Sequence, residues 1–254
     1  MNQVLRKFKV LFGVSIGISV FTILTGCGSR NITHRIEQAI LSELPKIIGP
    51  ADSYAVEVDG GLSGLMNSRL AGVRVTGRNV LFLNKYPIDE LLVEMRNVRF
   101  DSETRSLESV ESTSLHAAIS EASLLQYVAK EHPELRQTRI TISEGFIIAR
   151  TRPEIIGISA EVEAVGKLRV TEGRKVDFVA EKLTMGGMSL PSAMRSMVES
   201  HFNPLLDLSD APIPINLTRV EMVPGKVLIE GTVDLSNGLP RGQSSGGKVG
   251  AGKI

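Results

Sequence analysis

Few residues of this sequence have the types and spacing that covalent chemistry would need. Residues 242–246, GQSSG, have the glycine and serine spacing of a hydrolase nucleophile turn. Residues 242–249 approach a phosphate-binding loop, with Val249 where Ser or Thr is needed. Both motifs require a strand before them and a helix after them, whereas the chain around them is rich in Gly and Ser. We therefore expect neither motif to be a site.

The histidines and acidic residues give no ligand or catalytic spacing either. No histidine lies in an H-E-x-x-H motif or a similar spacing, and no pair of carboxylates stands out. The four histidines are far apart in the sequence: His34, His116, His132 and His201. The sequence therefore predicts a protein that is not an enzyme, with no metal site and no cofactor.

The one residue with a distinct chemical expectation is Cys27, the single cysteine among 254 residues. It follows an uncharged apolar run over residues 10–24, which is short for a membrane-spanning helix of roughly 20 residues but has the length of a signal-peptide core. Three basic residues precede this run: Arg6, Lys7 and Lys9. An ordinary cleaved signal, or an anchor helix with a chance cysteine, would explain the same run.

The residues next to Cys27 favour lipidation. Leu24-Thr25-Gly26-Cys27 resembles the bacterial lipobox, in which the cysteine is acylated and becomes the mature N-terminus. One acyl chain anchors a protein only marginally, and two or three anchor it stably. We predict a lipoprotein signal peptide over 1–26 and a lipidated linker over 27–31. The expected location is the bacterial cell envelope, on a membrane and facing the periplasm or exterior.

Charge and aromatic content exclude some partners. Basic and acidic residues nearly balance, at 29 against 28, and the chain has no Trp and few Tyr and Phe. A broad basic patch and stacking platforms are therefore not expected, which argues against nucleic acid as a partner.

Hydrophobic periodicity predicts alternating helices and strands. Helices are expected over 32–48, 120–135 and 190–204, with groups of short strands between them and a closing hairpin at the end. Strands joined by short turns favour antiparallel pairing and an α+β class. We predict a single α+β domain over 32–236 and a disordered Gly/Ser-rich tail over 237–254.

The later part of the chain resembles the LmeA-like phospholipid-binding family. The resemblance covers about residues 32–236 and is carried by Gly186-Gly187, Leu190-Pro191, Phe202-Asn203-Pro204, Asp207-Leu208, Pro214-Ile215 and Glu230-Gly231 in this order. It implies a bacterial envelope protein that binds phospholipid in an apolar groove. It also implies long helices packed on a curved antiparallel β-sheet, as in tubular lipid-binding (BPI-like) folds, and no catalytic residues.

The candidate lining of such a groove comes from the apolar stripes of the first and third helices and the first strand. The candidates are Ile36, Ile40, Leu44, Val56, Val58, Met194, Met197 and Phe202. Periodicity does not distinguish a groove from a filled core. The expected function is a membrane-anchored lipoprotein that binds phospholipid or a related acyl lipid, for envelope lipid transport or maintenance. The alternative is a non-catalytic scaffold lipoprotein that binds another envelope protein.

Overall fold

The computed structural model describes residues 30–60, 64, 67–101, 106–152 and 160–234. Three sequence predictions lie outside these residues: the signal peptide, lipidation at Cys27 and the disordered tail over 237–254.

The described chain contains three α-helices, one 3₁₀ turn and twelve strands, in the order that the sequence predicts. The helices and the turn are α2 (Arg30–Ile47), α4 (Glu121–Glu131), η1 (Pro133–Leu135) and α5 (Ser192–Phe202). The strands of the first half are β1 (Ser53–Asp59), β2 (Arg69–Phe82), β3 (Tyr86–Asp101) and β4 (Ser106–Ser120). The remaining strands are β5 (Arg139–Ser143), β6 (Phe146–Thr151), β7 (Val162–Thr171), β8 (Lys175–Met185), β9 (Met188–Ser189), β10 (Leu206–Asp207), β11 (Ile215–Val223) and β12 (Lys226–Val233).

The expected α+β arrangement of long helices on one curved sheet is wrong. The described structure is mostly β, with two separate antiparallel sheets, and α4 and α5 have only 11 residues each. Strands β2, β3 and β4 have 14, 16 and 15 residues. The sequence showed where strands lie, but their division into two sheets depends on pairing between distant segments, which periodicity does not report.

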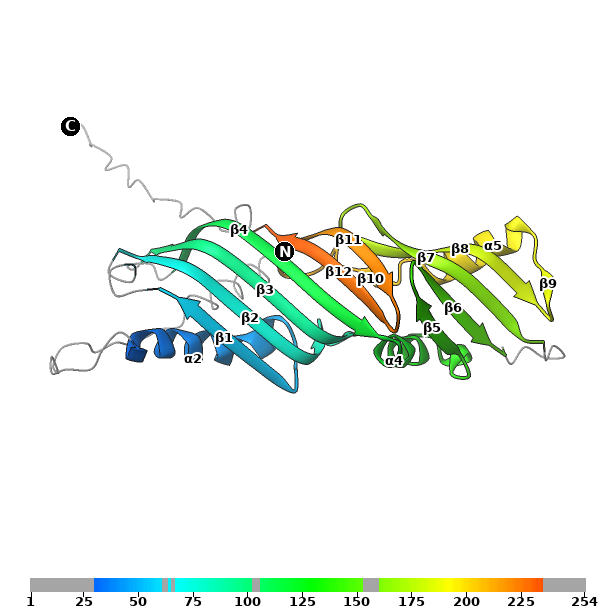
Figure 1. Cartoon of the computed structure of the whole chain (residues 1–254), viewed down its shortest axis with the longest axis horizontal. Coiled ribbons are helices and arrows are strands. Elements are labelled where there is room, and N and C mark those ends of the chain that lie inside the picture. The colour runs from blue at the N-terminus through cyan, green and yellow to red at the C-terminus, as the bar shows by residue number, and fades with distance from the viewer. Residues whose placement is uncertain (1–29, 61–63, 65–66, 102–105, 153–159, 235–254) are drawn as a thin grey trace, which may run out of the picture.

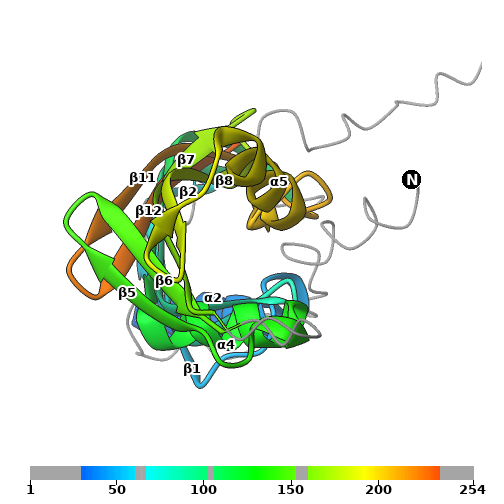
Figure 2. The ribbon, with the colours of Figure 1, turned by 90° about the vertical axis from the view of Figure 1, so that its right-hand side faces the viewer.

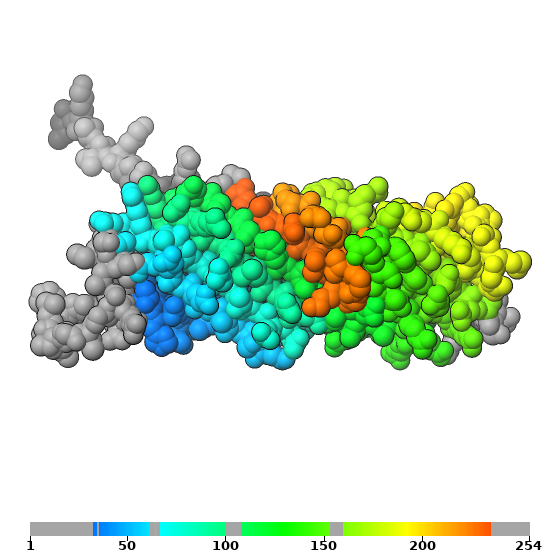
Figure 3. All heavy atoms as spheres, in the orientation of Figure 1, coloured from blue at the N-terminus to red at the C-terminus, as the bar shows by residue number. Residues whose placement is uncertain are grey.

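The two sheets lie end to end and give an elongated molecule (Figure 1). The first sheet has the order β1-β2-β3-β4-β12-β11, and the second has β10-β8-β7-β6-β5, with β9 paired to β8. The closing hairpin crosses the middle of the molecule (Figure 3) and packs against β7 and β5 of the second sheet. Seen along the long axis, the strands form a curved wall, with α2 and α4 on one side and α5 on the other (Figure 2).

Helix α2 packs on the first sheet, and the two form a buried core in the first half of the molecule. Its stripe contributes Ile40 and Leu44, which are 5% and 4% exposed, and they belong to the same buried cluster as Val56 of β1. Burial of each such side chain contributes roughly 1.5–3 kcal/mol. The first sheet and α2 therefore form a stable base for the second half.

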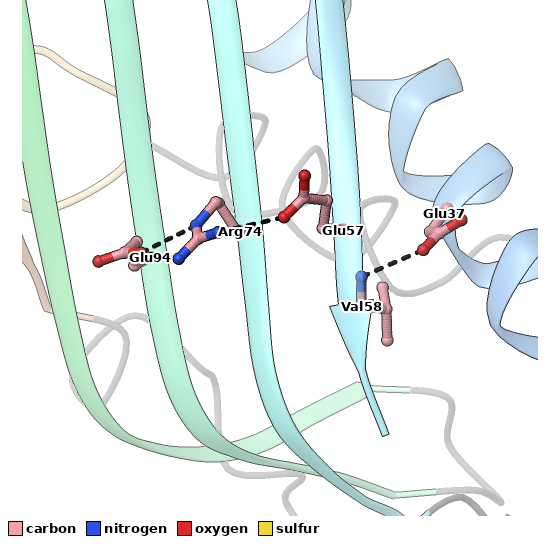
Figure 4. A network of polar contacts seen from close by, with 5 residues as sticks. All are labelled: Glu37, Glu57, Val58, Arg74 and Glu94. Atoms are coloured by element: carbon pink, nitrogen blue, oxygen red, sulfur yellow. Dashed lines mark hydrogen bonds and ion pairs between the residues drawn. The ribbon is translucent and has the colours of Figure 1, made fainter. Parts of the chain in front are cut away.

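Helix α2 also covers the free edge of the first sheet. The backbone N–H of Val58 in β1 donates to Glu37 of α2 at 3.2 Å (Figure 4). On the exposed face, Arg74 of β2 donates to Glu94 and Glu57 at 2.9 and 3.2 Å, and these two carboxylates raise the pKa of Arg74. Exposed ion pairs add little stability. The covered edge matters more, because an open edge strand can pair with another chain.

Candidate functional site

A large apolar cavity lies between the inner face of the second sheet, α4, η1 and α5. We call it the sheet-two cavity. Its volume is about 570 Å³, within the range of roughly 300–1,000 Å³ typical of small-molecule sites. Its walls are lined by Leu124, Val128, His132, Glu134, Leu135, Thr138, Ile140, Ile147, Ala149, Thr151, Val162, Ala164, Phe178, Leu183, Met185, Leu190, Met194, Met197, Val198, His201, Phe202 and Leu205.

Small residues on two neighbouring strands leave room for this cavity. Ala149 of β6 and Ala164 of β7 are directly paired, and both lie on the cavity face. Paired residues share one face of a sheet, so two methyl groups stand where larger side chains would fill the space. Beside them, a Cβ added to Gly166 would meet the backbone oxygen of Val179 and would lie 2.6 Å from the Phe178 ring, so glycine leaves room for this ring beside β7.

Helix α4 is fixed at its first turn, where it joins the two sheets. Ser120 caps the helix by accepting the N–H of Ser123 at 3.2 Å, as serine does at many helix starts. Asp89 of β3 accepts the N–H of Ser120 at 2.7 Å. Glu121 accepts the N–H of Ile142 in β5 at 2.6 Å, so α4 covers the free edge of the second sheet.

Helix α5 is held to β8 by polar side chains rather than by a buried stripe. Asn203 accepts the N–H of Phe178 and donates to its carbonyl, each at 2.8 Å. Glu199 accepts the N–H of Ala180 at 2.7 Å, and Arg195 donates to the carbonyl of Glu181 at 2.9 Å. None of the described residues of α5 is buried. The helix is therefore a cover over the cavity that rests on one strand edge.

The cavity reaches the surface beside α5. Met194 and Met197 line the cavity and are also 42% and 70% exposed. Methionine is flexible and fits irregular apolar partners. An apolar chain could therefore enter beside these two methionines of α5.

Polar groups gather at the same rim. Nδ1 of His132 lies 3.4 Å from Oε1 of Glu134, and Nε2 of His201 lies 3.7 Å from that oxygen. The pKa of Glu134 is lowered, first by a hydrogen bond from its own backbone and then by hydrogen bonds from the side chains of His132 and His201. Sequence analysis missed this cluster because the two histidines are distant in the chain and meet only when α5 folds over η1. No local signal could have found it.

Further along the wall, two threonines interrupt the apolar lining. The hydroxyl oxygens of Thr138 and Thr151 are buried and have no hydrogen-bond partner within the described residues. Their methyl groups keep these positions compatible with an apolar ligand, while the hydroxyls add a small polar component to the wall.

The predicted lining residues fall into two groups. Met194, Met197 and Phe202 line the sheet-two cavity. The other five lie in or against the core beneath α2 and line neither the sheet-two cavity nor the smaller apolar cavity described below: Ile36, Ile40, Leu44, Val56 and Val58. Their contact with lipid remains a prediction.

A second, much smaller apolar cavity lies between α4 and the inner face of the first sheet. It measures about 80 Å³ and shares Leu124 and Leu205 with the sheet-two cavity. The apolar lining is therefore continuous from one sheet to the other, and the sheet-two cavity is the larger of these two apolar cavities.

A comparison of this chain with models of known protein families shows which family it belongs to. The model of the family described as LmeA-like phospholipid-binding matches residues 28–232. The chain belongs to the LmeA-like phospholipid-binding family. The resemblance found in the sequence is thus confirmed, and membership supports lipid binding by this protein.

Other comparisons add no further relative of this LmeA-like protein. Neither the curated proteins nor the solved structures gave a match. The family is described by binding and not by catalysis, which is consistent with the expectation that the protein is not an enzyme. Within the described residues, no helix is both long and apolar enough to span a bilayer.

Proposed function

We propose that this protein is a membrane-anchored lipoprotein that binds phospholipid or a related acyl lipid in the sheet-two cavity. One observation carries the proposal: an apolar cavity of about 570 Å³ that opens beside α5 in a chain of a phospholipid-binding family. The lipobox around Cys27 supports attachment to the membrane that holds the ligand. Transport or maintenance of envelope lipids is the expected role.

The binding mechanism follows from the lining. Acyl carbons inside the cavity leave water, at a gain of roughly 0.8 kcal/mol per CH₂ buried, offset by the loss of freedom on binding. The head group stays at the rim, near His132 and His201, where water still hydrates it. A cover held by one strand edge allows α5 to move aside as lipid enters.

Native mass spectrometry with lipid extraction tests this proposal on the full chain purified in mild detergent. We expect co-purified phospholipid at about one per protein. Ala164→Phe places a ring in the cavity and should lower the bound fraction at least fivefold. Ala55→Phe, the same change at an exposed position on β1, is the matched control and should bind normally.

A protein that carries no lipid and takes up none from added vesicles would contradict the proposal. That result would favour the scaffold alternative and a search for a protein partner. Equal lipid binding by Ala164→Phe and the parent protein would place the lipid outside the sheet-two cavity.

A further inference from the structure

Three potential metal ligands meet at the rim of the sheet-two cavity. The two histidine nitrogens and a carboxylate oxygen of Glu134 all lie within 4.8 Å of one another. We propose that His132, Glu134 and His201 form a binding site for a divalent transition-metal ion, with Zn²⁺ as the preferred ion. The ion would link α5 to the segment that follows α4.

The distances fit this ion. Zinc binds histidine nitrogen at 2.0–2.1 Å and carboxylate oxygen at 2.0–2.2 Å in a tetrahedral arrangement, which places ligand atoms about 3.4 Å apart. The His132–Glu134 and His201–Glu134 separations are 3.4 and 3.7 Å. The third separation, at most 4.8 Å, can close by rotation of the exposed His201 side chain.

The ligand types favour a transition metal over other ions. Two imidazoles and one carboxylate form a known zinc set that leaves one coordination position open. Magnesium and calcium prefer oxygen ligands, and imidazole suits zinc, copper and nickel. Water or the phosphate of a bound lipid could fill this open position; the phosphate alternative rests on the proposed function.

The ligands come from two elements that are held independently. His132 is the C-cap of α4, where its N–H donates to the carbonyl of Val128 at 2.8 Å and its carbonyl accepts the N–H of Leu135 at 2.9 Å. His201 lies in the last turn of α5, two residues before the Asn203 side chain that pairs with β8. The backbone of both histidine ligands is thus in place before an ion binds.

Phe202 supports the side chains as well. Its ring packs edge-on against both imidazoles, with centroids 4.9 Å away in each case. The side chains of His132, Glu134 and His201 are 21%, 53% and 65% exposed, so an ion can enter from solvent. A site of this kind would add a second attachment at the C-terminal end of α5, which Asn203 already joins to β8.

Isothermal titration with ZnCl₂ tests the site on the full chain, purified without a histidine tag and stripped with EDTA. We expect one Zn²⁺ per chain, counted by elemental analysis, and no comparable binding of Mg²⁺. His201→Ala and His132→Ala should each weaken binding at least tenfold. His116→Ala, at an exposed position of β4, is the control and should bind as the parent does.

A second measurement checks the link between the two elements. Hydrogen exchange of α5 amides should slow severalfold with Zn²⁺ in the parent and should not change in His201→Ala. Absence of Zn²⁺ binding, or binding that both histidine variants retain, would overturn the proposal. Because these assays need no lipid, failure of the lipid-binding proposal would leave their outcome unaffected.

Discussion

At the scale of residues, Ile40 and Met197 are both apolar stripe positions on helices, but their surroundings differ. Ile40 is 5% exposed in the core beneath α2, while Met197 is 70% exposed at the cavity rim. A spacing pattern gives both residues the same status, because it reports which face is apolar and not whether that face is covered. A substitution at Ile40 should therefore lower folding stability, and a substitution at Met197 should lower lipid binding.

Ile40→Ala should lower the free energy of unfolding by about 2–5 kcal/mol, the range for a large core residue cut to alanine. Met197→Asp should change it by less than about 0.5 kcal/mol, as exposed positions do, yet reduce bound lipid severalfold by placing a charge where acyl chains enter. Urea unfolding and lipid extraction measure the two effects, with Met197→Leu as the control. A stable Ile40→Ala variant would contradict the described core.

Tyr54 links stability to pH. Burial raises the pKa of Tyr54 from 10.0 to about 12, and its hydroxyl donates to the carbonyl of Gly49 at 2.8 Å. Since the unfolded chain loses this proton near pH 10 and the folded chain keeps it, the free energy of unfolding should fall as pH rises from about 10 to 12. Burial also raises the pKa of Tyr127 to about 12, so Tyr54→Phe should reduce this decline in urea titrations and not abolish it; an unchanged slope would contradict the shift at Tyr54.

At the scale of elements, each described α-helix protects a strand edge with a glutamate. Glu37, Glu121 and Glu199 accept backbone N–H groups of β1, β5 and β8 at 3.2, 2.6 and 2.7 Å. This arrangement satisfies edge donors without another strand. The three helices are therefore fastened to the sheets as well as packed on them, and α5 depends on such fastening most.

Glu199→Ala should loosen α5 on β8, while the hydrogen bonds of Asn203 and Arg195 to this strand remain. The N–H of Ala180 would lose its acceptor, and exchange of this amide and of α5 should become at least tenfold faster, while exchange in the first sheet stays the same. Hydrogen exchange read by mass spectrometry or NMR measures this change. Ser200→Ala, at a neighbouring exposed position on α5, should have no such effect; equal exchange in both variants would show that Glu199 does not hold the helix.

The elements themselves were largely predictable, and the sheets were not. Pro133 and the Asn203-Pro204 pair marked the ends of α4 and α5, because proline interrupts a helix. The pairing of β12 with β4 joins segments that lie far apart in the chain. No local pattern reports such a partner, so the split into two sheets was missed.

At the scale of the whole molecule, the site forms where distant segments meet. Met194, Met197 and Phe202 were found from the helical stripe, but the opposite wall, with Ala149 and Ala164, was not. Alanine in a strand carries no ligand signal by itself; it matters here because the paired position is also alanine. The rim histidines were missed for the same reason, since only the folded chain brings them together.

Membrane attachment through Cys27 is a prediction about the whole chain. If Cys27 is acylated, the full chain should sediment with membranes and gain the mass of two or three acyl chains at its N-terminus. Cys27→Ala should lack this added acyl mass and should retain residues 1–26, while lipid still binds in the cavity. A parent chain that carries no acyl mass, or that keeps residues 1–26, would contradict acylation of Cys27.

The central claim is that lipid acyl chains occupy the sheet-two cavity. The most direct test uses a phospholipid with a photoreactive group on its acyl chain, cross-linked to the full chain and mapped by mass spectrometry. We predict cross-links to β6, β7 and α5, including Ala164 and Met197. Cross-links to Ile40 and Leu44 instead, or to exposed strand faces with none in the second sheet, would contradict the account.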